Sequence, residues 1–258
     1  MKSSLIAQLL AEFLGTMVLI LFGTGVVAMV VLFGKGAPGE IVNGGYTNLT
    51  IAWGLGVTMG IVIAGKTSGA HLNPAVTIAL AAFRGFSWAR VLPYCIAQTA
   101  GAFLAAALVF LNYRPAFFKV DPGLDHTAGI FTTFPAFPDM PSAGLLDQVI
   151  GTALLLMLTF AIIDDRNQIS PILAPILIGL VVVGIGMAFG GMYGFAINPA
   201  RDFGPRLFTV VAGFKNNGLT DGSRVFWIPI AGPILGGLIG ALVYDFGIRK
   251  FLPKASGK

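Results

Sequence analysis

Two copies of one polar triplet interrupt a chain that is otherwise strongly apolar. The first copy is Asn73-Pro74-Ala75, and the second is Asn198-Pro199-Ala200. Asn is a good N-cap, and Pro suits the first turn of a helix, where its missing N–H costs nothing. Each triplet therefore predicts the start of a helix. The side-chain amides of Asn73 and Asn198 would cap these helices and offer N–H donors to a polar solute.

Two charged residues lie in apolar segments, where their types indicate a function. Arg201 directly follows the second triplet, and Glu12 lies inside the first long apolar segment. Charged side chains at membrane depth are expensive and usually functional. Arg201 is therefore a candidate functional residue of the membrane interior. A carboxylate at Glu12 would accept hydrogen bonds from nearby donors.

The chemistry of an enzyme is missing from this inventory. The chain has two histidines and one cysteine, and it has no cluster of carboxylates. An intramembrane enzyme would need a nucleophile–base pair or a metal cluster, and we find neither. We therefore expect no catalytic residue, no metal site and no cofactor.

Composition indicates what kind of element must position these residues. Of the 258 residues, 56% are hydrophobic and only 10% are charged. Soluble domains carry about 25% charged residues, so the chain is predicted to be a membrane protein. Its net charge of +5 reports membrane topology. A basic stripe with interleaved aromatic residues is missing, so we expect no nucleic-acid partner.

Hydropathy predicts six membrane-spanning helices and two shorter ones. About 20 apolar residues cross a bilayer as a helix. The two stretches that begin at the triplets, 73–83 and 198–210, are too short to cross. Non-helical backbone at membrane depth is tolerated where it lines a water-filled cavity, so we expect half-helices whose preceding loops line one. The six predicted spans cover residues 5–33, 46–65, 88–112, 145–163, 172–190 and 225–248.

The chain also repeats internally. Glu12-x-x-Gly15-Thr16 is echoed by Gln148-x-x-Gly151-Thr152. We expect one channel domain over 1–258, with repeats at about 1–112 and 145–250 joined by the extracellular loop 113–144. Each repeat holds three full spans, which is an odd number, so the second must be inverted relative to the first. The two half-helices would then meet near the midplane, N-terminus to N-terminus.

Charge bias predicts the orientation. Lys and Arg are more numerous on the side that carries both termini, which places the termini in the cytoplasm. The long loop near 113–143 is rich in proline and phenylalanine. Loops of this kind are often functional lids. A folded extracellular cap is an equally open alternative.

The predicted geometry suits a neutral solute. Two facing half-helix N-termini place about +0.5 charge each at the midplane, which disfavours a cation. The residues before each Asn would be extended, so their carbonyls could form a line of acceptors along the lumen. A lumen with acceptors on one wall and apolar side chains on the other suits a polyhydroxylated solute. The expected carbonyls belong to Gly69, Ala70, His71, Met192, Tyr193 and Gly194.

The most specific stretches resemble a known family. They are Ala11 to Thr16, Ser68 to Val76 and Gly194 to Pro205. The chain resembles the aquaporins, or major intrinsic proteins, and more narrowly the bacterial glycerol facilitators of the aquaglyceroporin branch. The resemblance covers essentially the whole chain. It implies an all-α membrane fold of six transmembrane helices and two re-entrant half-helices, a homotetramer, and one pore per subunit.

The resemblance also implies roles for individual residues. The narrowest, outer constriction would be formed by Trp53, Gly186, Phe195 and Arg201. Water-selective members carry histidine where this chain has Gly186, so glycine would leave space, while Trp53 and Phe195 form an apolar wall for the glycerol backbone. Three further residues would have a supporting role. Glu12 would hold loop backbone N–H groups, Gln148 replaces a second glutamate, and Asp202 would be structural.

These observations predict a passive channel in the plasma membrane. It would conduct glycerol, other small uncharged solutes and water across the lipid bilayer while excluding ions and protons. Other candidates for the main solute are protonated lactic acid, urea, dihydroxyacetone and hydrogen peroxide. A secondary active transporter is less favoured, because coupling usually needs several intramembrane carboxylates and only Glu12 qualifies.

Overall fold

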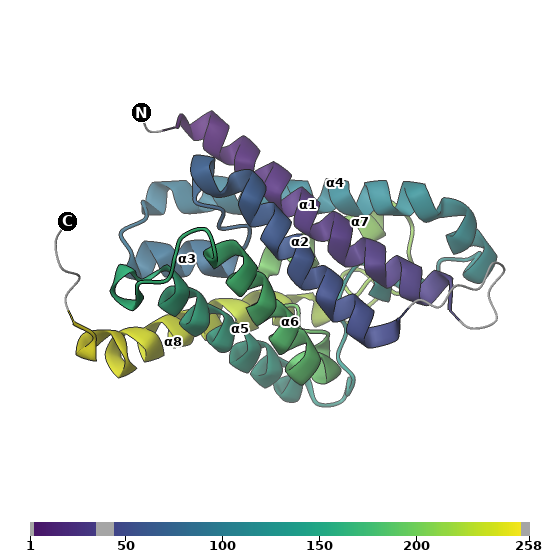
Figure 1. Ribbon diagram of the computed structural model, residues 1–258. Helices are drawn as coiled ribbons and strands as arrows, with labels where there is room; N and C mark the ends of the chain where they lie inside the picture. Colours follow the sequence, from purple (N-terminus) through teal and green to yellow (C-terminus); the bar gives the residue numbers. More distant parts are fainter. Residues whose placement is uncertain (1–2, 35–43, 254–258) are drawn as a thin grey trace.

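The computed structural model describes residues 3–34 and 44–253. Within these ranges the chain is helical and contains no β-strand. The described part has six helices that are long and apolar enough to cross a membrane, which confirms the predicted number. They are arranged as a bundle with both termini at one end (Figure 1). The six are α1 (Leu5–Leu32), α2 (Gly45–Ser68), α4 (Trp88–Val120), α5 (Pro141–Ile163), α6 (Ala174–Tyr193) and α8 (Ile228–Gly247).

The two triplets begin short helices, as predicted. These are α3 (Pro74–Phe83) and α7 (Pro199–Val211). Asn73 Oδ1 accepts a hydrogen bond from Ala75 N at 2.9 Å, and Asn198 Oδ1 accepts one from Ala200 N at 3.0 Å. Both helices are too short to span a bilayer, which needs about 20 residues. They contact each other inside the bundle and are therefore half-helices.

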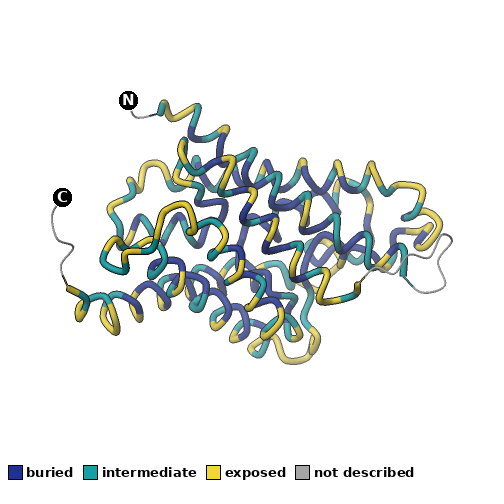
Figure 2. The backbone as a smooth tube through the Cα atoms, viewed as in Figure 1, coloured by how far each residue is buried: buried dark blue, intermediate teal, exposed yellow. Residues whose placement is uncertain are grey.

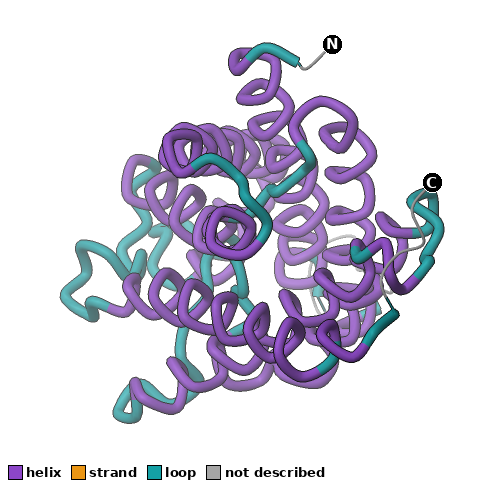
Figure 3. Tube along the Cα trace, turned by 90° about the vertical axis from the view of Figure 1, so that its left-hand side faces the viewer, coloured by secondary structure: helices purple, strands orange, loops and turns teal. Residues whose placement is uncertain are grey.

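Helix contacts repeat between the two halves. α1 packs on α2 and α4, and α5 packs in the same way on α6 and α8. The short helices α3 and α7 each contact α4 and α8, which are the last long helices of the first and the second repeat. Figure 3 shows the helices end-on. The arrangement is the inverted internal repeat that the sequence echo predicts.

Small residues allow the closest of these contacts. A Cβ atom at Gly101 of α4 would collide with the Phe13 carbonyl of α1. At the matching contact in the second half, a Cβ at Gly236 of α8 would collide with the Val149 carbonyl of α5. Lipid gives helices no hydrophobic reason to associate, so close packing has to hold them together. Glycine at both positions makes that packing available.

Among the predicted boundaries that differ from the structure, three affect the loops near the cavity. The connection expected at 113–144 is shorter at both ends, because α4 continues to Val120 and α5 begins at Pro141. Pro115 does not end α4, whose last turns are anchored by the fully buried Phe117. α6 extends through Tyr193, so the residues expected to be extended before Gly194 are partly helical.

The connection 121–140 is a folded cap. It contains the short helix η1 (Thr127–Ile130), and Ile130 and Phe131 are 1% and 0% exposed. The Phe131 ring stacks on Phe117 and packs edge-on against Phe214. Figure 2 shows the buried parts of the chain running through the bundle and into this end. Of the two alternatives for this loop, the structure therefore has the cap.

Candidate pore and selectivity filter

The loops before the two half-helices share an unusual backbone. Positive φ angles occur at Ala70 (50°) and Leu72 (52°), and again at Phe195 (39°) and Ile197 (43°). Positive φ is uncommon outside glycine and is an outlier for bulky or β-branched residues. Such strain persists only where the surrounding structure holds it, and it clusters at functional sites. The two loops therefore adopt one strained conformation twice.

The two asparagines join these loops at the centre of the bundle. Asn73 Nδ2 donates to the Ile197 carbonyl at 2.9 Å, and Asn198 Nδ2 donates to the Leu72 carbonyl at 2.8 Å. Each amide nitrogen carries two hydrogens, so the cross-link leaves one donor on each side chain. The sequence predicted the donors but missed that half of them hold the opposite loop.

A cavity of about 80 Å³ lies beside this junction. This is room for several waters, since one water needs at least about 10–15 Å³. One part of the lining consists of the two strained loops and Arg201. Most of the rest is apolar, and its residues come from α1, α2, α5 and α6: Leu19, Val57, Ile61, Leu155, Ile178 and Val182.

Arg201 and two aromatic rings meet at this cavity. The guanidinium carbon of Arg201 lies 4.0 Å from the centre of the Trp53 ring, which is within cation–π range. Trp53 and Phe195 pack edge to face, with 6.3 Å between ring centres. Arg201 Nη1 donates to the Phe131 carbonyl of the cap at 3.0 Å. The cap therefore contacts Arg201, one of the predicted filter residues, and this contact was not predicted from the sequence.

Gly186 lies behind this group and does not line the cavity. A Cβ atom at Gly186 would lie 3.0 Å from both the Phe195 ring and Thr50. The space left by the missing side chain is thus filled by Phe195, which the sequence did not predict. The Gly186 carbonyl accepts a hydrogen bond from the Tyr46 hydroxyl at 2.9 Å.

The expected line of carbonyls needs a correction. The Met192 carbonyl accepts from Ala136 N at 3.0 Å, so it holds the cap. Tyr193 belongs to α6, and Gly69 and Gly194 are the residues that end α2 and α6. The loop residues that line the cavity start one position later than expected in the first half and three positions later in the second. They are Ala70, His71, Leu72 and Asn73, and then Phe195, Ala196, Ile197 and Asn198.

Glu12 holds the first loop, as the resemblance implied. Its carboxylate accepts from His71 N at 2.9 Å and from Leu72 N at 2.7 Å. It also accepts from Ser68 Oγ at 2.6 Å and from Gln98 Nε2 at 2.8 Å. With four donors, a fully buried carboxylate is compensated, and the strained loop is fixed to α1.

Glu12 is not the only carboxylate within the bundle. Asp147 of α5 is 7% exposed, and Asp202 of α7 is fully buried. Asp147 was not among the residues predicted from the sequence, although it stands inside a predicted span beside Gln148. Gln148 Nε2 donates to Asp147 Oδ2 at 3.0 Å, and Gln148 Oε1 accepts from Ile197 N at 2.9 Å.

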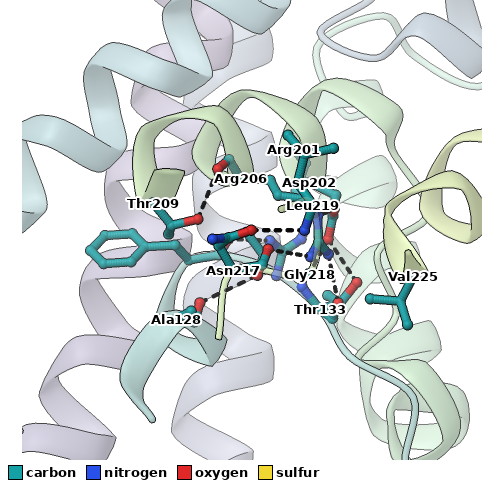
Figure 4. A network of polar contacts seen from close by, with 12 residues as sticks. Ala128, Thr133, Arg201, Asp202, Arg206, Thr209, Asn217, Gly218, Leu219 and Val225 are labelled. Carbon is teal, nitrogen blue, oxygen red and sulfur yellow. Dashed lines mark hydrogen bonds and ion pairs between the residues drawn. The ribbon is translucent and has the colours of Figure 1, made fainter. Parts of the chain in front are cut away.

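Asp202 belongs to a buried network centred on Arg206 (Figure 4). Arg206 Nε pairs with Asp202 Oδ1 at 2.8 Å, one helical turn away. Its other nitrogens donate to the Thr133 carbonyl at 2.7 Å and to the Asn217 carbonyl at 2.8 Å. Asp202 Oδ2 in turn accepts from Thr133 N and Oγ1. The network therefore fixes the cap to α7, two residues from the carbonyl that binds Arg201.

These features define a class of protein. Six crossing helices enclose two opposed half-helices, and a small, mostly apolar cavity that Asn73, Asn198 and Arg201 also line lies where they meet. The chain is a multi-pass membrane protein of the pore-forming kind.

Comparison with known proteins identifies the family. Residues 1–244 match the family "Major intrinsic protein", and the chain belongs to it. A probable glycerol uptake facilitator protein of Thermotoga maritima is 45% identical, over 92% of this chain and 97% of the relative. The glycerol uptake facilitator protein of Escherichia coli is 42% identical, over 97% and 91%. The X-ray structure of the aquaglyceroporin from Plasmodium falciparum matches with a TM-score of 0.82 at 31% identity, over 94% of this chain and 96% of that one.

Proposed function

We propose that this protein is a passive channel for glycerol, which also conducts water and other small uncharged solutes. The observation that carries the proposal is the two-sided cavity beside Asn73, Asn198 and Arg201. Glycerol has hydroxyls along one edge and carbon along the other. Its hydroxyls can replace their hydrogen bonds to water by hydrogen bonds to the loop carbonyls and the amide donors. Its carbon edge then contacts the apolar wall. The relatives named as glycerol uptake facilitators support this choice of solute.

Ion exclusion follows from the same groups. Two half-helix N-termini carry about half a positive charge each, and they face each other at the cavity. Arg201 adds a full positive charge at 6% exposure. Small cations are repelled there, and the site does not replace the water ligands that they would lose. Asn73 and Asn198 supply N–H donors at the junction. These donors interrupt the hydrogen-bonded chain of waters along which a proton would move.

We assign the solute-selecting role to the group around Arg201. Trp53 and Phe195 would hold the carbon edge, Arg201 would donate to hydroxyls, and Gly186 would keep Phe195 in place. The central position belongs to the two Asn-Pro-Ala triplets. Glu12, Gln148 and Asp202 support the loops.

The whole chain forms one channel domain in this proposal. Both termini lie at the same end of the bundle (Figure 1), and the excess of Lys and Arg there favours the cytoplasm. We place the protein in the plasma membrane, by analogy with uptake facilitators. Exposed apolar side chains cover the outside of the bundle, and they suit lipid and a homotetramer with one pore per subunit.

Flux into proteoliposomes tests the proposal. Stopped-flow light scattering under a glycerol gradient should give non-saturating uptake with a low activation energy. Lactic acid, urea and dihydroxyacetone, measured in the same preparation, would rank the solutes. Saturable, ion-dependent flux would instead indicate a carrier. The partners of Glu12 and Asp202 argue against that outcome, because both carboxylates are already engaged in holding loops.

A further inference from the structure

The two halves of the bundle hold their strained loops by different chemistry. In the first half, the carboxylate of Glu12 accepts two adjacent loop N–H groups, those of His71 and Leu72. In the second half, the matching residue is the neutral Gln148. Its amide oxygen accepts from Ile197 N alone, at 2.9 Å.

The second half has a carboxylate one position earlier. Asp147 precedes Gln148, whereas the matching residue before Glu12 is the apolar Ala11. Gln148 is fully buried and Asp147 is 7% exposed. Asp147 Oδ2 accepts from Gln148 Nε2 at 3.0 Å. In the second half, the carboxylate thus lies one residue earlier than in the first. It acts on the loop through the Gln148 amide.

This contact determines which way the amide of Gln148 faces. A glutamine side chain can present either its oxygen or its NH₂ group to a neighbour. A carboxylate oxygen accepts hydrogen bonds, so Asp147 pairs with the NH₂ group and turns the oxygen toward Ile197. The opposite orientation would set NH₂ against the Ile197 N–H and leave two buried donors unpaired, which is costly.

The orientation matters because Ile197 belongs to the central junction. Its φ of 43° is strained for a β-branched residue. Its carbonyl accepts from Asn73 Nδ2 at 2.9 Å, and its side chain lines the cavity. Asp147, Gln148 and Ile197 therefore form a chain of hydrogen bonds that ends on the asparagine of the other half.

We propose that Asp147 is a positioning residue of the pore, which orients the Gln148 amide so that it holds Ile197. The inference rests on the proposed channel function. It assigns a role to a group that does not touch the solute. It also predicts that a carboxylate at position 148 can replace the one at position 147 without loss of glycerol permeability. Glu12 is the carboxylate at the matching position of the first half.

Three variants test this. Asp147→Ala removes the orienting group, and glycerol permeability per folded protein should fall about fivefold, the effect of losing one hydrogen bond. Asp147→Ala with Gln148→Glu recreates the Ala-Glu pair of the first half, and permeability should return to within about twofold of wild type. Thr152→Val is the control. It removes a buried hydroxyl one turn along α5, and permeability should stay within about twofold.

Two results would overturn the inference: wild-type permeability in Asp147→Ala, or a double variant no better than the single one. If Asp147→Ala does not fold, Asp147→Asn replaces it, since an amide can pair in either orientation. Glycerol permeability should then fall below that of Thr152→Val, because part of the orienting preference is lost, and permeability equal to that of wild type would overturn the inference. Thermal unfolding midpoints in detergent should follow the same order as the fluxes. If wild-type vesicles take up no more glycerol than empty ones, the channel proposal fails, and the midpoints still judge the role of Asp147.

Discussion

At the scale of the residue, the shape of the site depends on the space that each side chain takes or leaves free for its neighbours. Gly186 illustrates this. Its missing side chain makes room for the Phe195 ring, which packs against Trp53, and the Trp53 ring in turn lies under the Arg201 guanidinium. In the proposed filter, Gly186 therefore acts indirectly, by leaving the space that the Phe195 ring occupies.

Gly186→His should reduce glycerol permeability far more than water permeability. The new side chain must push the Phe195 ring toward the cavity, and a barrier increase of about 1.4 kcal/mol for the larger solute corresponds to a tenfold loss. Stopped-flow measurements of both solutes check this. Gly184→His is the matched control on α6, because Gly184 has open space around it. Equal losses for glycerol and water would refute the filter assignment.

At the scale of the element, the half-helix α7 holds the cap as well as forming part of the pore. Arg206 and Asp202 lie on the same side of α7, at i and i+4, and both bind Thr133 of the cap. A Cβ at Gly218 would collide with the Arg206 guanidinium, so the second loop of that end is also shaped to this side chain. Arg201 is held by the carbonyl of Phe131, which lies two residues before Thr133 in the cap.

Arg206→Met should destabilise the protein strongly, because it leaves the fully buried Asp202 without its charge partner. Losing one partner of a buried pair costs about 3–5 kcal/mol. Adding Asp202→Asn should recover part of the loss, since the uncompensated charge disappears. Arg224→Met, at an exposed position, should change stability by less than about 0.5 kcal/mol. Thermal unfolding in detergent measures all four proteins, and equal midpoints for the two single variants would disprove the role of the network.

At the scale of the whole molecule, the two halves are tied at the centre and at the terminal end. The asparagine cross-links join the loops at the centre. At the terminal end, Arg84 after α3 makes a two-point ion pair with Asp245 of α8. Asp164, after α5, accepts from Tyr244 of α8 and pairs with Arg249 of η4 (Arg249–Phe251). These contacts close the end of the bundle that carries the termini.

The Asp164 contacts predict a pH dependence of stability. Burial tends to raise the pKa of Asp164, but hydrogen bonds from Arg166 N, Tyr244 and Arg249 outweigh it and lower the pKa below its ordinary value of 3.8. A lowered pKa in the folded state stabilises the fold above the unfolded pKa, and this stabilisation is lost as pH falls through the folded pKa.

Asp164→Asn should therefore lower the unfolding midpoint at pH 7, and its difference from wild type should shrink below about pH 4. Midpoints measured between pH 7 and pH 3 check this. Asp165→Asn is the control, because Asp165 is exposed in the same turn. A difference that stays constant over the whole range would contradict the prediction.

The sequence alone determined the architecture, because the signals involved are local. Hydropathy needs only about 20 consecutive residues to mark a span. Asn before Pro marks a helix start, as at Asn73 and Asn198. These signals located all six spans and both half-helices, and the largest difference in bounds is at the end of α4, which runs to Val120. The match between Glu12 and Gln148 indicated a repeat, and the odd number of spans in each repeat predicted its inversion. The glutamate's role in holding the first loop came from the resemblance, and the contacts agree with it.

Only the tertiary structure decided how distant residues complete the site. The carbonyl that holds Arg201 belongs to Phe131, the ring in the space at Gly186 belongs to Phe195, and the amide donors of the two asparagines are shared with the opposite loop. The Asp202–Arg206 spacing could have been read as a helical ion pair, but its cap partner Thr133 could not. Contacts across long separations depend on how helices pack, and no local pattern in the chain carries that information.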